Sequence, residues 1–273
     1  MKKKIQYDYL EKNKLNLLNN IIGNIKFNLN KNYLPYGAHW IYFNENYSLK
    51  ELGNDGHPKR GTFFPLLKGY KRMFAGSELF FKKNMSLNKK IKKQTNIESI
   101  IKKKSNNNNL YFVTVESIYK DPEDVLLKEI QSIVFIKNNH ISKKNNKINI
   151  LLGLKLIKKK AFRYNNIDLF RSSALTYNSH KIHYDYNFAT KEEGHKDLLV
   201  HGPLIATKVL CECHSLYDNK IKYFQFKINK PIYVNQKMLL KIYAKKKCSD
   251  NVYIYIFNIY NEIAFTGKIK LKS

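Results

Sequence analysis

The first apolar positions along the chain recur at the spacing of a helix. Between residues 5 and 26, Leu and Ile fall mostly three or four positions apart, with Lys, Asn and Glu between them. The positions that set this pattern are Leu10, Leu15, Leu17, Leu18, Ile21 and Ile22. We therefore expect one amphipathic helix over residues 5–26.

Residues 33–109 show two further patterns. Nearly all the Pro and Gly of the first half lie within residues 33–85, and the run Gly53–Pro65 (GNDGHPKRGTFFP) predicts a loop. The stretch Met85–Asn109 is rich in Lys and Asn, and its few Ile residues interrupt it. This composition predicts a polar strand, then an exposed loop, then a turn at Asn106–Asn109.

Alternating and β-branched residues then predict a series of strands. Leu110–Ser117 and Leu126–Ile136 flank a turn at Asp121-Pro122. Farther along, an apolar segment, Leu198–Leu216, precedes four more candidates: Tyr223–Lys230, Met238–Ala244, Val252–Ile259 and Ile263–Leu271. The last three alternate well enough to be neighbouring antiparallel strands.

A polar and charged stretch, residues 138–149, is the best linker candidate and divides the chain into two similar halves. Each half has a helical or loop-rich front followed by antiparallel strands. That order is typical of α+β modules in which a sheet wraps a helix. We therefore expect modules at residues 1–137 and 150–273.

The charge of the chain invites a nucleic-acid interpretation, which its composition opposes. The 273 residues carry a formal net charge of +29, yet only Arg60, Arg72, Arg163 and Arg171 among the 50 basic residues are arginine. Proteins that bind nucleic-acid phosphates and bases favour Arg, because its guanidinium can donate two hydrogen bonds side by side. The Lys excess accompanies Asn and Ile throughout the chain, as a general composition bias would. We therefore expect no nucleic-acid partner.

The cysteines and the N-terminus indicate a reducing compartment. Cys211, Cys213 and Cys248 are too few for a disulfide framework, and the first two are expected to be buried structural thiols. The N-terminal MKKKIQYDYLEKNK has no apolar signal region, and no apolar run reaches the roughly 20 residues of a membrane span. We expect a cytoplasmic protein without a membrane span.

The chemistry is concentrated in Ser173–Leu210, where acid–base groups stand beside a Gly-Pro turn. If residues 178–185 are extended, His183 and Asp185 share a face with Lys181. Asp185 is also placed to cap a helix beginning near Phe188, and we favour that structural role. Histidine is the residue type that ordinarily titrates near neutrality, and His183 lies close in sequence to the amide of Asn178, which favours a part in proton transfer.

Two further features of this segment bear on cofactors and charge stabilisation. His180 and His183 have no third ligand at a familiar spacing, so we expect no metal. Pro203 suits the first position of a helix, and helix N-termini present free N–H groups. The backbone N–H of Gly202 is therefore a candidate donor to a developing oxyanion.

These residues resemble those of a known superfamily. His183-x-Asp185, then Ala189, then His201-Gly202 looks like the signature of the MaoC-like (R)-specific enoyl-CoA hydratases. The runs ALTYNSHKIHYD and DLLVHGPL are most similar to type 2 hydroxyacyl-thioester dehydratases and mesaconyl-CoA hydratases, in which an Asn, here Asn178, replaces an Asp. The first half resembles their N-terminal module in four runs: His39–Phe43, Glu51–Gly61, Arg72–Gly76 and Leu110–Val115.

The resemblance implies a double hot-dog fold and a hydro-lyase acting at the 2,3-position of an acyl thioester. The C-terminal module would be catalytic, and the degenerate N-terminal module would complete a substrate tunnel, so that one chain equals a hot-dog dimer; a further homodimer is left open. His183 would be the general base and acid, with Asn178 orienting water. The residues expected to bind substrate are Tyr177, His180, Tyr184, His201, Pro203, Trp40 and Arg72.

By resemblance, no cofactor is expected beyond the CoA or phosphopantetheine that the substrate carries. Asp55, His57, Arg60 and Gly76 also match motifs of the N-terminal module, where we expect loop order and tunnel lining rather than catalysis. Three hypotheses stay open: a CoA-thioester hydratase of the mesaconyl-CoA type, an acyl-carrier-protein dehydratase of fatty-acid synthesis, and a non-catalytic module that binds thioesters or nucleic acid. A cation near the acyl terminus would favour a dicarboxylate, and a long apolar tunnel would favour fatty chains.

Overall fold

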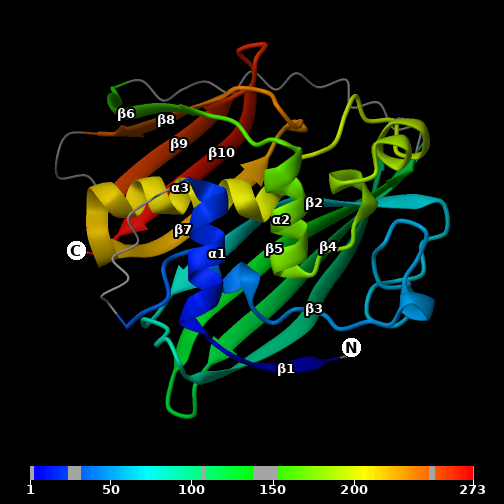
Figure 1. Cartoon of the computed structure of the whole chain (residues 1–273), viewed down its shortest axis with the longest axis horizontal. Coiled ribbons are helices and arrows are strands. Elements are labelled where there is room, and N and C mark those ends of the chain that lie inside the picture. Colours follow the sequence, from blue (N-terminus) through cyan, green and yellow to red (C-terminus); the bar gives the residue numbers. More distant parts are fainter. Residues whose placement is uncertain (1–2, 24–31, 106–107, 138–152, 246–249, 273) are drawn as a thin grey trace.

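One antiparallel sheet of ten strands runs through the molecule (Figure 1), in the order β1-β3-β4-β5-β2-β7-β10-β9-β8-β6. The structure is a computed structural model and describes residues 3–23, 32–105, 108–137, 153–245 and 250–272. Its strands are β1 (Lys4–Tyr9), β2 (Tyr70–Phe81), β3 (Lys90–Ser105), β4 (Asn108–Lys120), β5 (Val125–Lys137), β6 (Lys155–Phe162), β7 (Ile221–Ile228), β8 (Met238–Ala244), β9 (Asn251–Phe257) and β10 (Ile263–Leu271).

Each half of the chain contributes one half of this sheet. Strands β1 to β5 come from the first half, strands β6 to β10 from the second, and β2 pairs with β7 where they meet. Gly76 lies at this junction with φ of 151°, and a Cβ there would stand 2.1 Å from the carbonyl oxygen of Phe226. Only glycine permits so close an approach of the two backbones.

Three α-helices, α1 (Lys12–Ile22), α2 (Asn166–Thr176) and α3 (Gly202–Tyr217), lie on one side of the sheet (Figure 1). Every residue of α3 from Leu204 to Cys213 is buried, and α1 packs against both α2 and α3. Pro203 at its first turn and the apolar run that follows account for this helix, which the sequence predicted. Cys211 and Cys213 are buried in α3 as free thiols, as expected.

A β-bulge in β2 decides which of its side chains reach the interior. The pairing of β2 with β5 shifts register between Phe74 and Gly76. Before the bulge, Arg72 and Phe74 border the cavity described below, and after it Ser77 and Leu79 are buried. Successive side chains of a strand point to opposite faces of the sheet. The extra residue at the bulge shifts this alternation, so that even-numbered residues face inward before the bulge and odd-numbered residues face inward after it.

The prediction of one helix over residues 5–26 is wrong at its beginning. Residues Lys4–Tyr9 form β1, which pairs with β3, and the helix starts only at Lys12. KIQYDY alternates in burial, as an edge strand does, and its pairing with β3 overrides the helical spacing. Within α1 the predicted apolar face is buried through Leu15, Leu18, Ile21 and Ile22, and residues 24–26 lie outside the described residues.

The exposed loop expected within Met85–Asn109 is also wrong. Strand β3 continues for 16 residues, to Ser105, and β4 begins at Asn108. Ile91, Thr95 and Ile97 are buried on the inner face, and this alternation holds the Lys-rich stretch in the sheet. Residues 106 and 107 of the predicted turn lie outside the described residues.

Other predictions can be compared directly with the structure. The strands around Asp121-Pro122 are confirmed as β4 and β5, and the last three strands are neighbours in the order β10-β9-β8. The loop at Gly53–Pro65 is confirmed, whereas β2 and α2 were not predicted. The candidate linker and Cys248 lie outside the described residues. None of the helices that the structure describes has the length and apolar character to cross a bilayer.

Candidate active site

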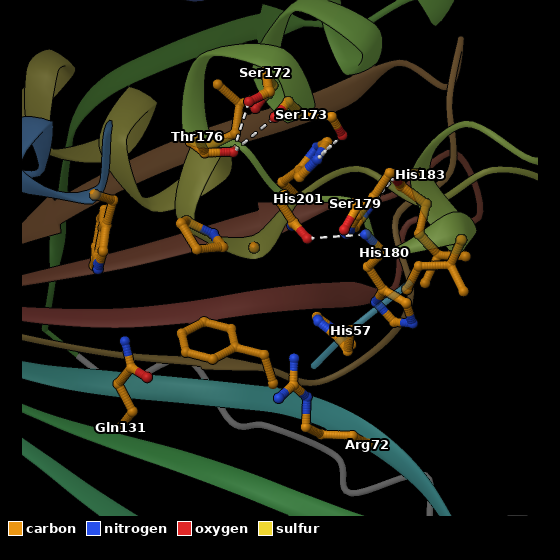
Figure 2. Close-up of a pocket in the computed structure, with 18 of the residues that line it drawn as sticks. His57, Arg72, Gln131, Ser172, Ser173, Thr176, Ser179, His180, His183 and His201 are labelled. Carbon is orange, nitrogen blue, oxygen red and sulfur yellow. Dashed lines mark hydrogen bonds between the residues drawn. The ribbon is translucent and has the colours of Figure 1, made fainter. Parts of the chain in front are cut away.

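A cavity of about 1240 Å³ lies between the two halves, and residues of both line it. Every residue that the sequence predicted to be catalytic or to bind substrate borders this cavity. Its polar end is formed by the loop between α2 and α3 together with β2 and the 53–58 loop of the N-terminal half (Figure 2). Asp185, predicted as a helix cap, is outside the lining.

The loop after α2 is built by local hydrogen bonds. Helix α2 ends at Thr176, its C-cap Tyr177 has a left-handed φ of 52°, and the N–H of Asn178 then donates to Ser173 O (2.8 Å). Asn178 Oδ1 accepts a hydrogen bond from the N–H of His180 (3.1 Å), an Asx turn that leads into the 3-10 turn Lys181–His183. Asp185 Oδ1 accepts from the N–H of Phe188 (2.9 Å), which is the contact of an N-cap.

The extended conformation considered for residues 178–185 is therefore wrong. The backbone turns at Lys181–His183, so the alternation that would place Lys181, His183 and Asp185 on one face does not apply. The side chains of Asn178 and Asp185 hydrogen-bond to nearby backbone N–H groups and so favour a turn over a strand, as is usual for these residue types.

His183 is held with one ring nitrogen bonded and the other left over. Its Nδ1 lies 2.8 Å from the carbonyl oxygen of Leu199, which can only accept, so Nδ1 carries the proton. Burial lowers the pKa of His183 to about 4, although the Leu199 hydrogen bond opposes this shift. At neutral pH the ring is uncharged, and Nε2 has a lone pair available as a base.

His201 supports this ring from behind. The two imidazoles are stacked with centroids 3.6 Å apart and an interplanar angle of 18°. His201 Nε2 lies 2.9 Å from Ser173 Oγ, which fixes its ring against α2. Burial, and the neighbouring His183, lower the pKa of His201 well below its usual value. A second neutral ring therefore packs against the candidate base.

Helix α3 begins beside these histidines, with His201 as N-cap and Gly202 as first residue. A Cβ on Gly202 would lie 2.5 Å from Cδ1 of Ile228 and 3.0 Å from Cδ1 of Phe74, so a larger residue needs these side chains to move. The first N–H groups of a helix have no partner within it and carry the positive end of its dipole. The cavity wall at Gly202 is therefore suited to a developing negative charge.

A loop of the N-terminal half completes the site. The His57 ring packs on that of His180 (centroids 4.0 Å apart), and His180 meets His183 edge-on at 5.6 Å. Ser179 Oγ donates to Gly56 O (2.5 Å), and a Cβ on Gly56 would stand only 1.8 Å from Ser179 O. Figure 2 shows His57 between His180 and Arg72. The loop expected only to line the tunnel thus contacts the candidate catalytic turn directly.

Arg72 presents an unpaired guanidinium to the cavity. It lies over the Phe64 ring at 5.2 Å and makes no hydrogen bond or ion pair with any residue the structure describes. Asp55, the carboxylate that most favours the charged form of Arg72, instead pairs with Arg60 (3.6 Å). Burial lowers the pKa of Arg72 to about 10, so it remains a cation at neutral pH.

The remaining predicted residues lie around the wall. Tyr177 and Tyr184 are exposed at the mouth, and the Tyr184 hydroxyl donates to Ser179 O (2.9 Å). Trp40 is half-buried in the wall, and its Nε1 donates to Glu129 Oε1 (2.9 Å). Among the described residues, no cluster of three His, Cys, Asp or Glu side chains is arranged to hold a metal ion.

The fold and the site together define a class, the double hot-dog hydratases and dehydratases of acyl thioesters. The chain belongs to the hydroxyacyl-thioester dehydratase type 2 family, whose sequence model matches residues 37–234. It is 32% identical over 200 residues to the mesaconyl-C(4)-CoA hydratase of Chloroflexus aurantiacus, spanning 73% of this chain and 71% of the relative. The protein is accordingly a hydro-lyase of the acyl-thioester hydratase and dehydratase type.

Solved structures agree on the fold. A MaoC-like dehydratase from Phytophthora capsici matches with a TM-score of 0.74 at 10% identity, over 100% of this chain and 95% of that one. A Mycobacterium tuberculosis protein described as a double hotdog fold matches with a TM-score of 0.65 at 8% identity, over 100% and 96% of the two chains. The double hot-dog fold that the sequence predicted is thereby confirmed.

Proposed function

We propose that His183 is the single proton-transfer group in the reversible addition of water to a 2-enoyl thioester. The observation that carries this proposal is its fixed tautomer: Nδ1 is committed to the Leu199 carbonyl, and Nε2 is left as the one basic nitrogen of the ring. Because the ring is neutral at physiological pH, it can take a proton at once.

In the hydration direction, Nε2 removes a proton from water while the water oxygen bonds to Cβ. Electrons move through the double bond onto the thioester oxygen, where the N–H of Gly202 and the helix dipole stabilise the enolate. Collapse of the enolate takes a proton from the His183 imidazolium to Cα, so the ring returns to neutrality and one water has been added. Dehydration follows the same steps in reverse.

Asn178 has a narrower role than a carboxylate would have. Its Oδ1 already accepts from the N–H of His180, so one lone pair of Oδ1 remains to accept from water and the Nδ2 hydrogens remain to donate to water or to the thioester oxygen. An amide cannot take a proton at this pH, so it orients the reactant without acting as a second base.

Two carriers and two acyl classes fit the cavity. The unpaired Arg72 near the histidines favours an acyl group with a carboxylate close to the reacting carbons, as in the branched dicarboxylic group named for the Chloroflexus relative. The cavity volume of about 1240 Å³ also favours a longer fatty chain, delivered on acyl-carrier protein. Either carrier brings its own phosphopantetheine, so no separate cofactor is required. The buried free thiols agree with a reducing compartment such as the cytoplasm.

The test is a spectroscopic hydratase assay with crotonyl-CoA and mesaconyl-CoA, followed by the corresponding carrier-protein thioesters. We expect His183→Ala to lower kcat by about 10²- to 10⁴-fold and Asn178→Ala to lower it less. His214→Ala, on α3 outside the cavity lining, is the matched control and should change kcat/KM little. Retained activity in His183→Ala, or no turnover of any enoyl thioester by the wild type, would reject the proposal.

A further inference from the structure

A band of polar side chains crosses the inner face of the N-terminal half of the sheet. This polar band consists of Lys93 and Thr95 on β3, Ser117 on β4 and Gln131 on β5, all of which border the cavity. Thr95 and Ser117 are register partners and their hydroxyls are 3.0 Å apart. Apolar residues follow farther along the same strands: Ile97, Val113, Val115, Ile133 and Phe135. Thr95 and Ser117 bond to each other and Gln131 bonds to Glu129, so Lys93 is the member of the band that a plain hydrocarbon tail would leave without a hydrogen-bond partner.

Glu129, which lies beside the band on β5, forms no ion pair with Lys93. Its side chain is fully buried and its oxygens already accept several hydrogen bonds, from Trp40 Nε1 (2.9 Å), Ser77 Oγ (3.1 Å), Tyr119 Oη (3.0 Å) and Gln131 Nε2 (2.9 Å). Burial opposes its ionisation, but His39 and Lys93 lower the pKa of Glu129 to about 2. Glu129 is thus a satisfied carboxylate that ties Trp40 and Gln131 in place.

Lys93 is the unsatisfied member of the band. Its ammonium lies 5.5 Å from the centroid of the Tyr119 ring and 5.8 Å from that of Phe43, in the half-buried cavity wall. It makes no hydrogen bond or ion pair with any residue the structure describes, so its three donors are left for a ligand. Burial lowers the pKa of Lys93, and the charge of Glu129 opposes that shift.

The polar band and the histidines occupy different parts of one cavity. Gln131 lies across the pocket from His57 and His180 in Figure 2, and the Arg72 guanidinium is on the histidine side. The cavity therefore offers room for an acyl group whose reacting carbons meet His183 to extend its far end toward the polar band. The cation available to that far end is Lys93, separate from Arg72.

We propose that the polar band is a second subsite, which binds a carboxylate at the far end of the acyl chain through the ammonium of Lys93. The substrate class would then be monothioesters of straight-chain dicarboxylic acids, longer than those whose carboxylate would reach Arg72. This inference rests on the proposed function, since it places the reacting carbons at His183. One hydroxyl of the Thr95–Ser117 pair donates to the other, and the remaining O–H would donate a further hydrogen bond to the same carboxylate.

The test compares chains of equal length with and without the terminal carboxylate. Kinetics are measured with trans-2-hexenedioyl-, octenedioyl- and decenedioyl-CoA against hexenoyl-, octenoyl- and decenoyl-CoA. We expect at least one length at which the carboxylate raises kcat/KM by about tenfold or more. Lys93→Met should lower kcat/KM for the carboxylate-ended chain to that of the methyl-ended chain measured in the same variant, and Lys93→Arg should restore part of the preference. Lys92→Met, one position along β3 on the other face, is the matched control.

Calorimetric binding of the saturated thioesters, adipoyl- and hexanoyl-CoA with their longer homologues, separates this inference from the proposed reaction. If the wild type hydrates none of the enoyl thioesters but binds a saturated carboxylate-ended thioester in a Lys93-dependent way, the subsite stands and the reaction does not. If enoyl thioesters are hydrated but the methyl-ended chain is preferred at every length, the subsite is wrong. A carboxylate preference that survives Lys93→Met also overturns it.

Discussion

The imidazole of His57, from the N-terminal half, packs on that of His180, from the C-terminal half, with ring centroids 4.0 Å apart. The contact bridges 123 positions of sequence and adjoins the turn that holds His183. The N-terminal half therefore contributes to the immediate surroundings of the candidate base, besides walling the cavity.

Replacing His57 by Ala should lower kcat by about tenfold, because His180 loses the ring that holds it and the 181–183 turn gains freedom. His57→Phe keeps an aromatic ring against His180 and should retain most of the activity. Steady-state hydration kinetics distinguish the two variants. If His57→Phe is as impaired as His57→Ala, a ring nitrogen of His57 contacts the reactant and the packing explanation fails.

Gly56→Ala should destabilise the protein and separate the two loops, since the new Cβ would overlap Ser179 O at 1.8 Å. Gly69→Ala is a matched control, because Gly69 also has a left-handed φ (73° against 82°) but nothing lies within 4 Å of its Cβ position. The control should cost only the backbone strain of about 1 kcal/mol. Thermal unfolding is the measurement, and equal losses of Tm in the two variants would contradict the close contact.

The fall of kcat/KM for hydration at low pH should reflect protonation of His183. Because the pKa of its imidazole is lowered to about 4, the base stays unprotonated down to that pH, and kcat/KM should remain level through pH 5 and fall near pH 4. A freely exposed histidine would give the same fall near pH 6.5. An acid limb at pH 6 or above would show that the ring is solvated in the free enzyme. Protein stability must be followed in parallel.

Stability itself should fall with acidity before the carboxylates titrate. His57, His180 and His201 also have pKa values well below 6.5, because burial disfavours their charged forms. Below pH 6.5 the unfolded chain binds more protons than the folded one, so the contribution of these rings is complete above pH 6.5 and is lost as the pH falls toward their lowered folded-state pKa values. For His183 alone the full loss is on the order of 3 kcal/mol.

Denaturant unfolding at pH 7.0, 6.0 and 5.0 measures this dependence. The slope of the unfolding free energy against pH should be reduced in His201→Phe, which removes one buried titrating ring and keeps an aromatic stack on His183. A wild-type slope near zero across this range would mean that the imidazoles are protonated, or exposed, in the folded state.

Much of the fold could be read from the sequence where one face of an element is continuously apolar. Helix α3 and the strands β8, β9 and β10 show such patterns and were predicted. Helix α2 was missed because its exposed face carries Ile167 and Phe170, which blurs its periodicity. Strand β1 was mistaken for helix because its partner, β3, is more than 80 positions away and leaves no local signal.

The candidate site shows the same division between local and distant information. The motif around His183 identifies the segment, and every residue predicted from it to be catalytic or to bind substrate borders the cavity. The part of His57 could not be predicted, since its position depends on a contact between loops. Nor could the partner of His183 Nδ1, because Leu199 takes part through its backbone carbonyl and any residue type has one.

Because of the bulge at Ala75, the number of residues in this part of β2 matters for function. Loss of one position between Arg72 and Ser77 would restore regular pairing and turn either the guanidinium or the buried serine outward. Alignments of related chains should keep this spacing intact, and library designs that vary loop length should leave it alone. Gly76 must keep its identity, and the whole stretch must keep its length, whatever the side chains at the other positions.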